Sequence, residues 1–268
     1  MTTIAPARAS KQQAESHPLS RGIRAFSDYR REVARARAKF AENAFATRIL
    51  SPGMSAERLE LFLIQYSSLG VAMTRPVEGW ILRAGKACLA MGMTDLGAAL
   101  VRHSKHEAGH DELMVRDTHA LVQRRHDRGL PLLSADALIA RRPGPAARAY
   151  IELHEHIIAG PAPWAQIAVE YEIERLAVIY GPSWVKQCKQ ILGNDILSYL
   201  SFVVEHTKLD VGHTHFNEQQ LTRFLDEYPD NSAILARAGS AALQAYSDFM
   251  DECFERVEAE AAATRDPV

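Results

Sequence analysis

The sequence has few cysteines, no long apolar run and no excess of one charge. Its three cysteines, Cys88, Cys188 and Cys253, form no Cys-x-x-Cys pair, which excludes a disulfide framework and favours a reducing, cytoplasmic location. Lys and Arg number 31 against 33 Asp and Glu, and this formal charge of −2 gives no electrostatic case for nucleic acid. Charges soon interrupt each apolar run and the first 20 residues lack a signal-peptide core, so we expect no membrane span and no export.

Apolar residues recur instead at helical spacing. Residues 1–20 are small, polar and aperiodic, which predicts a disordered N-terminal tail, followed by one helical domain over 21–268. No segment alternates in the manner of a strand, so the sequence predicts an all-α bundle of about seven to nine helices. The expected helices cover 23–45, 55–75, 80–89, 94–125, 147–158, 163–180, 183–192, 194–226 and 231–263, and a surface connection covers 127–146.

Histidines cluster on the helix expected at 194–226. At 100° per residue, His206, Asp210 and His213 fall within a window about 60° wide, so the three side chains share one face. Imidazole and carboxylate together suit iron, manganese or zinc. The alternative interpretation is a polar helix face with two ordinary histidines.

A second cluster lies on the helix expected at 94–125. Glu107 and His110 are three residues apart, which is the Glu-x-x-His unit that two-metal sites use in helical bundles, and His103 lies on the same stripe. The alternative is a solvated, charge-rich helix.

A third helix, at 163–180, offers a further carboxylate. Gln166, Glu170 and Glu174 form one polar face, whereas Glu172 lies among apolar residues. A carboxylate on an apolar stripe needs a partner, which is either a metal or an Arg or His from a neighbouring helix. This argument favours Glu172 as the third carboxylate and leaves Glu174 open.

In this order, the motifs resemble those of the heme-oxygenase-like diiron oxidases and oxygenases, which share a superfamily with heme oxygenase, the TenA thiaminases and the PqqC quinone synthases. The resemblance spans residues 23–226 and implies a heme-oxygenase-like bundle. It implies two irons per chain, one bound by Glu107, His110 and His206 and the other by Glu172, Asp210 and His213. It also implies O₂-dependent oxidation of a small amino-acid-derived or fatty-acid-like substrate in specialised metabolism, with an external electron donor and a homodimer as further expectations by analogy.

Three other functions compete with this one. Heme oxygenase takes its iron ligand from a histidine near the start of its first helix, and residues 21–50 contain no histidine, so heme is disfavoured. A metal-free oxidase or hydrolase similar to PqqC or TenA fits the same scaffold. A non-catalytic helical binding module is the last alternative, and it would carry its histidines on the surface.

Overall fold

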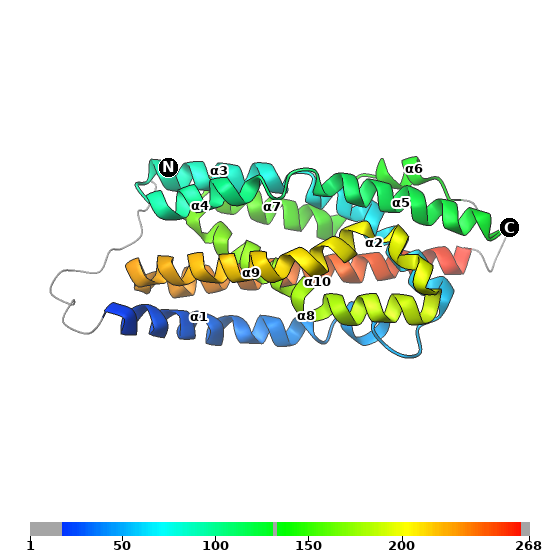
Figure 1. The fold of residues 1–268 in the computed structure, drawn as a ribbon, viewed down its shortest axis with the longest axis horizontal. Coiled ribbons are helices and arrows are strands. Elements are labelled where there is room, and N and C mark those ends of the chain that lie inside the picture. The colour runs from blue at the N-terminus through cyan, green and yellow to red at the C-terminus, as the bar shows by residue number, and fades with distance from the viewer. Residues whose placement is uncertain (1–17, 131–132, 264–268) are drawn as a thin grey trace.

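The structure, a computed structural model, describes residues 18–130 and 133–263, and every regular element in these ranges is a helix (Figure 1). This confirms the all-α prediction. The α-helices are α1 (Pro18–Phe40), α2 (Ala56–Thr74), α3 (Val77–Ala90), α4 (Thr94–Ser104), α5 (His110–Asp127), α6 (Ala135–Ile139), α7 (Pro145–Ala159), α8 (Gln166–Leu192), α9 (Ser201–Glu227) and α10 (Ser232–Ala263). Short π or 3-10 turns cover Phe45–Ile49, Pro163–Ala165, Asn194–Tyr199 and Pro229–Asn231.

The helices pack around one hydrophobic core. In Figure 1, α1, α9 and α10 run along the long axis of the molecule. α8 packs on α9, α1 on α9 and α10, α2 on α5, and α3 on α4, so α10 lies against the body of its own chain. None of the described helices combines the length and the apolar character needed to cross a membrane. All three cysteines are buried and free.

Helix boundaries follow local signals at several points. The side chain of Ser55 accepts a hydrogen bond from the Arg58 N–H and so caps the start of α2, and Pro76 separates α2 from α3. α1 begins at Pro18, inside the tail expected over 1–20, and residues 1–17 lie outside the described residues.

Two expected boundaries are wrong. The helix expected at 94–125 is interrupted between α4 and α5, because Gly109 has a φ of 81°, which only glycine adopts readily. The break expected at Gly181-Pro182 is absent, and α8 continues through Pro182. Here α8 approaches α9 closely, since a Cβ on Gly181 would lie 2.5 Å from the Thr207 Oγ1. Packing on α9 therefore holds the helix through its proline.

Candidate metal centre

Four segments bring nitrogen and oxygen donors together inside the bundle. They are the end of α4, the turn before α5 together with the first residue of that helix, the middle of α8, and the middle of α9. The donors are His103, Glu107, His110, Glu174, His206, Asp210 and His213. The turn at Gly109 matters here, because it places Glu107 between two helices instead of on the side of one continuous helix.

Glu107 faces two groups of donors at once. Its Oε2 lies 2.9 Å from His110 Nδ1, and its Oε1 lies 3.4 Å from His213 Nδ1. One metal-capable group comprises Glu107, His110 and His206, and the other comprises His103, Glu107, Glu174 and His213; within each group the donor atoms lie within 4.8 Å of one another. A carboxylate shared by two such groups is in the position of a bridging ligand in a two-metal site.

Four buried donor atoms in this cluster have no hydrogen-bond partner: His103 Nε2, Glu174 Oε1, Asp210 Oδ1 and His213 Nδ1. They are nevertheless close together. His103 Nε2 lies 2.9 Å from Glu174 Oε1, and His213 Nδ1 lies 3.6 Å from Asp210 Oδ1 and 3.8 Å from Glu174 Oε1. Because buried polar atoms are almost always hydrogen-bonded, four unpaired ones in a single cluster are the pattern expected of donors that converge on cations.

The backbone orients one ligand of the first group. His206 Nδ1 lies 2.8 Å from the carbonyl oxygen of Phe202, so Nδ1 carries the proton and donates it there. The ring also stacks on the Phe202 ring at a centroid distance of 3.9 Å. The lone pair of His206 Nε2 is therefore available to a metal, and the hydrogen bond on the other nitrogen is the usual support of a metal-ligating histidine.

The electrostatics of the cluster favour bound positive charge. Burial, followed by the charges of Glu107 and Asp210, raises the pKa of Glu174 well above its ordinary value. Burial also opposes ionisation of Glu107, but the hydrogen bond with His110 and the neighbouring imidazoles hold the pKa of this carboxyl at about 2. Burial lowers the pKa of His103 and keeps that imidazole neutral, as a metal ligand must be.

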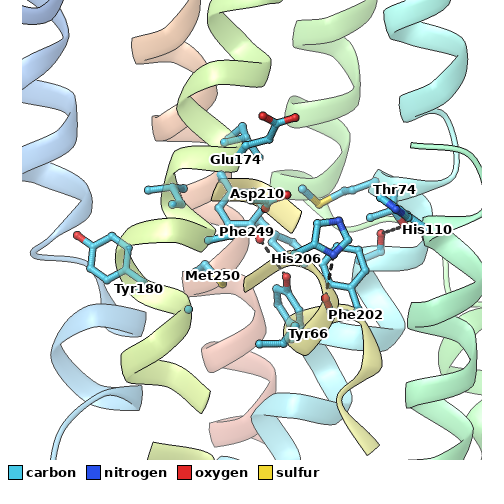
Figure 2. A pocket seen from close by; sticks show the side chains of 18 of the residues that line it. Tyr66, Thr74, His110, Glu174, Tyr180, Phe202, His206, Asp210, Phe249 and Met250 are labelled. Atoms are coloured by element: carbon cyan, nitrogen blue, oxygen red, sulfur yellow. Dashed lines mark hydrogen bonds between the residues drawn. The ribbon is translucent and has the colours of Figure 1, made fainter. Parts of the chain in front are cut away.

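A cavity of about 130 Å³ opens beside the cluster. Figure 2 shows His110, Glu174, His206 and Asp210 around it. Most of the other lining residues are apolar or aromatic, among them Phe40, Phe45, Trp184, Phe202, Phe249 and Met250. No Lys or Arg lines the cavity in the described part of the chain.

Glu172, the expected third carboxylate, does not reach the cluster. Its side chain is fully buried, as its position among apolar residues predicts, but it points to α1. Arg37 donates to both carboxylate oxygens, at 2.9 and 2.6 Å, and the Tyr29 hydroxyl donates to Oε1 at 2.6 Å. The partner that a buried carboxylate needs is thus an arginine of a neighbouring helix, and Glu174 takes the place in the cluster that was expected of Glu172.

No family model and no curated protein matches the sequence. A crystal structure of a domain of unknown function with a heme oxygenase-like fold, from Shewanella denitrificans, is similar with a TM-score of 0.70 at 16% identity. The similarity covers 91% of this chain and 96% of that chain. The fold is heme oxygenase-like. At this identity the likeness concerns the fold alone, and it confirms the fold that the motif order implied.

Within the heme oxygenase-like bundle, five of the six expected ligands come together, namely Glu107, His110, His206, Asp210 and His213. The sequence argument missed one candidate, His103, which was placed on the stripe of Glu107 and His110 but not in the ligand set. Its position four residues before Glu107 was the available signal. Four imidazoles and three carboxylates suit iron or another transition metal, so the residues present fit a pair of irons.

Proposed function

We propose that this protein is a non-heme diiron enzyme that uses O₂ to oxidise a small, largely apolar molecule. The observation that carries the proposal is the cluster of four unpaired, buried donor atoms beside Glu107, which belongs to both metal-capable groups. Three carboxylates contribute a formal charge of −3 against the +4 of two ferrous ions, so the ions offset a buried excess of negative charge. When bound, the iron pair would supply the electrons that reduce O₂.

The two groups of donors differ in a way that matters for the reaction. Glu107, His110 and His206 provide two imidazoles and one carboxylate, a set that leaves open positions in O₂-using iron enzymes. All three line the cavity, whereas His103 and His213 do not. O₂ and substrate would therefore approach mainly from the side of the first group, while the second group meets the cavity only through its carboxylates, Glu107 and Glu174.

The same observations count against the alternatives. A metal-free oxidase or hydrolase leaves the four unpaired donor atoms without explanation. A binding module with surface histidines conflicts with His103 and His110, whose exposed fractions are 3% and 8%.

The residues that line the cavity limit the class of substrate that it can bind. Two arginines outside the lining are engaged with carboxylates of the protein itself, since Arg75 pairs with Asp111 and Arg83 with Glu155. Without Lys or Arg in the described lining, the cavity suits an apolar body better than a zwitterionic amino acid. Of the two substrate classes that the motifs imply, the proposal favours the fatty-acid-like one, with an external electron donor as a further partner.

Anaerobic loading with Fe(II) tests the proposal. We expect two irons per chain and an absorbance change when O₂ is admitted. Glu107→Gln should lose both ions, because Glu107 belongs to both groups, and His103→Ala should weaken the second ion alone. His215→Ala, which changes an exposed histidine two residues from His213, is the matched control and should keep both ions. Fewer than two irons in the wild type with no response to O₂, or full loading of Glu107→Gln, would refute the proposal.

A further inference from the structure

A second polar group borders the same cavity, next to the donor cluster but outside it. It consists of His154 on α7 and of Gln166 and Glu170 on α8, with exposed fractions of 1%, 0% and 6%. Gln166 Nε2 donates to His154 Nδ1 at 2.7 Å and to Glu170 Oε1 at 2.5 Å. Because His154 Nδ1 accepts a hydrogen bond from the Gln166 amide, the neutral imidazole carries its own proton on Nε2.

This arrangement leaves three atoms of the group without partners. His154 Nε2 and Gln166 Oε1 are buried and have no hydrogen-bond partner. The Glu170 carboxyl accepts from Gln166 through Oε1 alone, so its Oε2 is free for a ligand. Both His154 and Glu170 line the cavity.

Several other polar groups in the lining are paired: the hydroxyls of Tyr66 and Tyr246 pair with each other at 3.1 Å, and Thr74 Oγ1 donates to the backbone. Outside the donor cluster, Trp184 Nε1 is a further lining N–H without an acceptor, but no carboxyl group is paired with it. An unpaired buried N–H is costly, so a ligand is the natural partner for that of His154.

We infer that His154 and Glu170 form a subsite that binds a hydroxyl group of the substrate. A hydroxyl can accept from His154 Nε2 and donate to the free oxygen of Glu170, so it matches both groups. An ammonium has no lone pair for His154. A carboxylate finds no Lys or Arg in the described lining to offset its charge. The inference rests on the proposed function only in calling the ligand a substrate.

The subsite is rigid and close to the donor cluster. The His154 ring stacks on Trp80 at a centroid distance of 4.0 Å and meets Tyr150 edge-on at 4.6 Å. Glu170 precedes Glu174 by one helical turn, about 6 Å along α8. A hydroxyl held here therefore places carbon atoms a few bonds away beside the candidate metals. Burial raises the pKa of Glu170 to about 8 and lowers that of His154 to about 3, so the imidazole is neutral and the carboxyl is readily protonated. A hydroxyl fits either form of Glu170, because it donates to the ionised carboxyl and accepts from the protonated one.

A matched set of ring compounds tests the subsite: benzyl alcohol, toluene, benzylamine and benzoate. Their size is appropriate, because an apolar cavity of about 150 Å³ holds benzene. Binding to the full-length protein is measured by calorimetry or ligand-observed NMR, with the metal content of the same sample determined. We expect benzyl alcohol to bind about tenfold more tightly than toluene, since a buried donor is left unpaired by toluene. Benzylamine and benzoate should bind more weakly than benzyl alcohol.

Variants separate recognition from folding. His154→Phe keeps the aromatic ring but removes the donor, so it should abolish the preference for benzyl alcohol and leave toluene binding unchanged. Glu170→Leu should also reduce the preference, whereas Glu170→Gln retains a hydrogen-bonding group and should keep most of it. If His154→Phe fails to bind toluene, Glu170→Leu carries the test.

Equal binding of benzyl alcohol and toluene by the wild type would overturn the inference, as would an unchanged preference in His154→Phe. The two proposals fail separately. A hydroxyl preference in a protein that takes up no iron would refute the diiron function alone, and iron uptake without the preference would refute the subsite alone.

Discussion

Two glutamates on α8, Glu172 and Glu174, are only two residues apart, and the structure gives them opposite roles. Glu172 links α8 to α1 through Arg37 and Tyr29, whereas Glu174 belongs to the donor cluster. Replacing each with glutamine keeps side-chain size and removes the charge. We therefore expect one variant to lose stability and the other to lose metal.

For Glu172→Gln the expected loss of unfolding free energy is about 3 kcal/mol, within the range for breaking a buried ion pair. Arg37 is left with a buried, unpaired charge, although its side chain is 17% exposed and water relieves part of the cost. In a chain of this size the loss corresponds to a drop of about 6–12 °C in melting temperature. Iron uptake should remain at two ions per chain.

For Glu174→Gln the pattern reverses. The metal-free protein should be as stable as the wild type or more so, because burial and the charges of Glu107 and Asp210 already disfavour the ionised Glu174. The second metal ion should bind more than about 100-fold more weakly, since even loss of a group that only supports a ligand costs 10–100-fold.

The assay combines urea denaturation of the metal-free proteins with iron titration and elemental analysis. Glu172→Gln serves as the control for metal uptake and Glu174→Gln as the control for stability. The reasoning is refuted if Glu172→Gln loses an iron while Glu174→Gln keeps both, or if neither variant is destabilised.

Two further predictions concern stability. The pKa of His154 falls to about 3 on burial, below its ordinary 6.5, so the unfolded state takes up a proton first as the pH falls. Between pH 8 and pH 5 the wild type should therefore lose about 2 kcal/mol more unfolding free energy than His154→Phe. Urea denaturation at each pH measures this difference, and an equal loss in the two proteins would contradict the prediction. A Cβ on Gly239 would lie 2.9 Å from Glu172 Cγ and 3.0 Å from the Tyr29 hydroxyl. Gly239→Ala should cost about 1–3 kcal/mol. On α3, a Cβ on Gly79 would meet open space, so Gly79→Ala should raise the free energy of unfolding by about 0.5–1 kcal/mol. If the two glycine variants changed the stability in the same direction, the packing argument would be refuted.

The α9 motif shows how far helical spacing alone can be trusted. His206, Asp210 and His213 share one face of any regular helix at that position, and the structure keeps them on one side of α9, facing the donor cluster. Local signals also gave the start of α2 at Ser55. The turn at Gly109 was missed because one glycine in a helical pattern is usually tolerated, and only its positive φ shows the break.

The glutamates of α8 show where such an argument ends. Projection correctly separated Glu172 from the polar face of Gln166, Glu170 and Glu174, but it could not say what that polar face contacts. In the structure α8 is buried on both sides, so both faces carry carboxylates with interior partners: Glu172 passes α10 to reach Arg37 of α1, and Glu170 and Glu174 line the cavity.

The sequence by itself determined the helical class, the order of the motifs and which side chains share a face of each helix, because these depend on spacing within one helix. Only the tertiary structure decided that Glu174 and His103 join the cluster, that Glu172 belongs to Arg37, and that His154 meets Glu170. These choices depend on which helix covers each face, and the periodicity of a single helix carries no information about its neighbour.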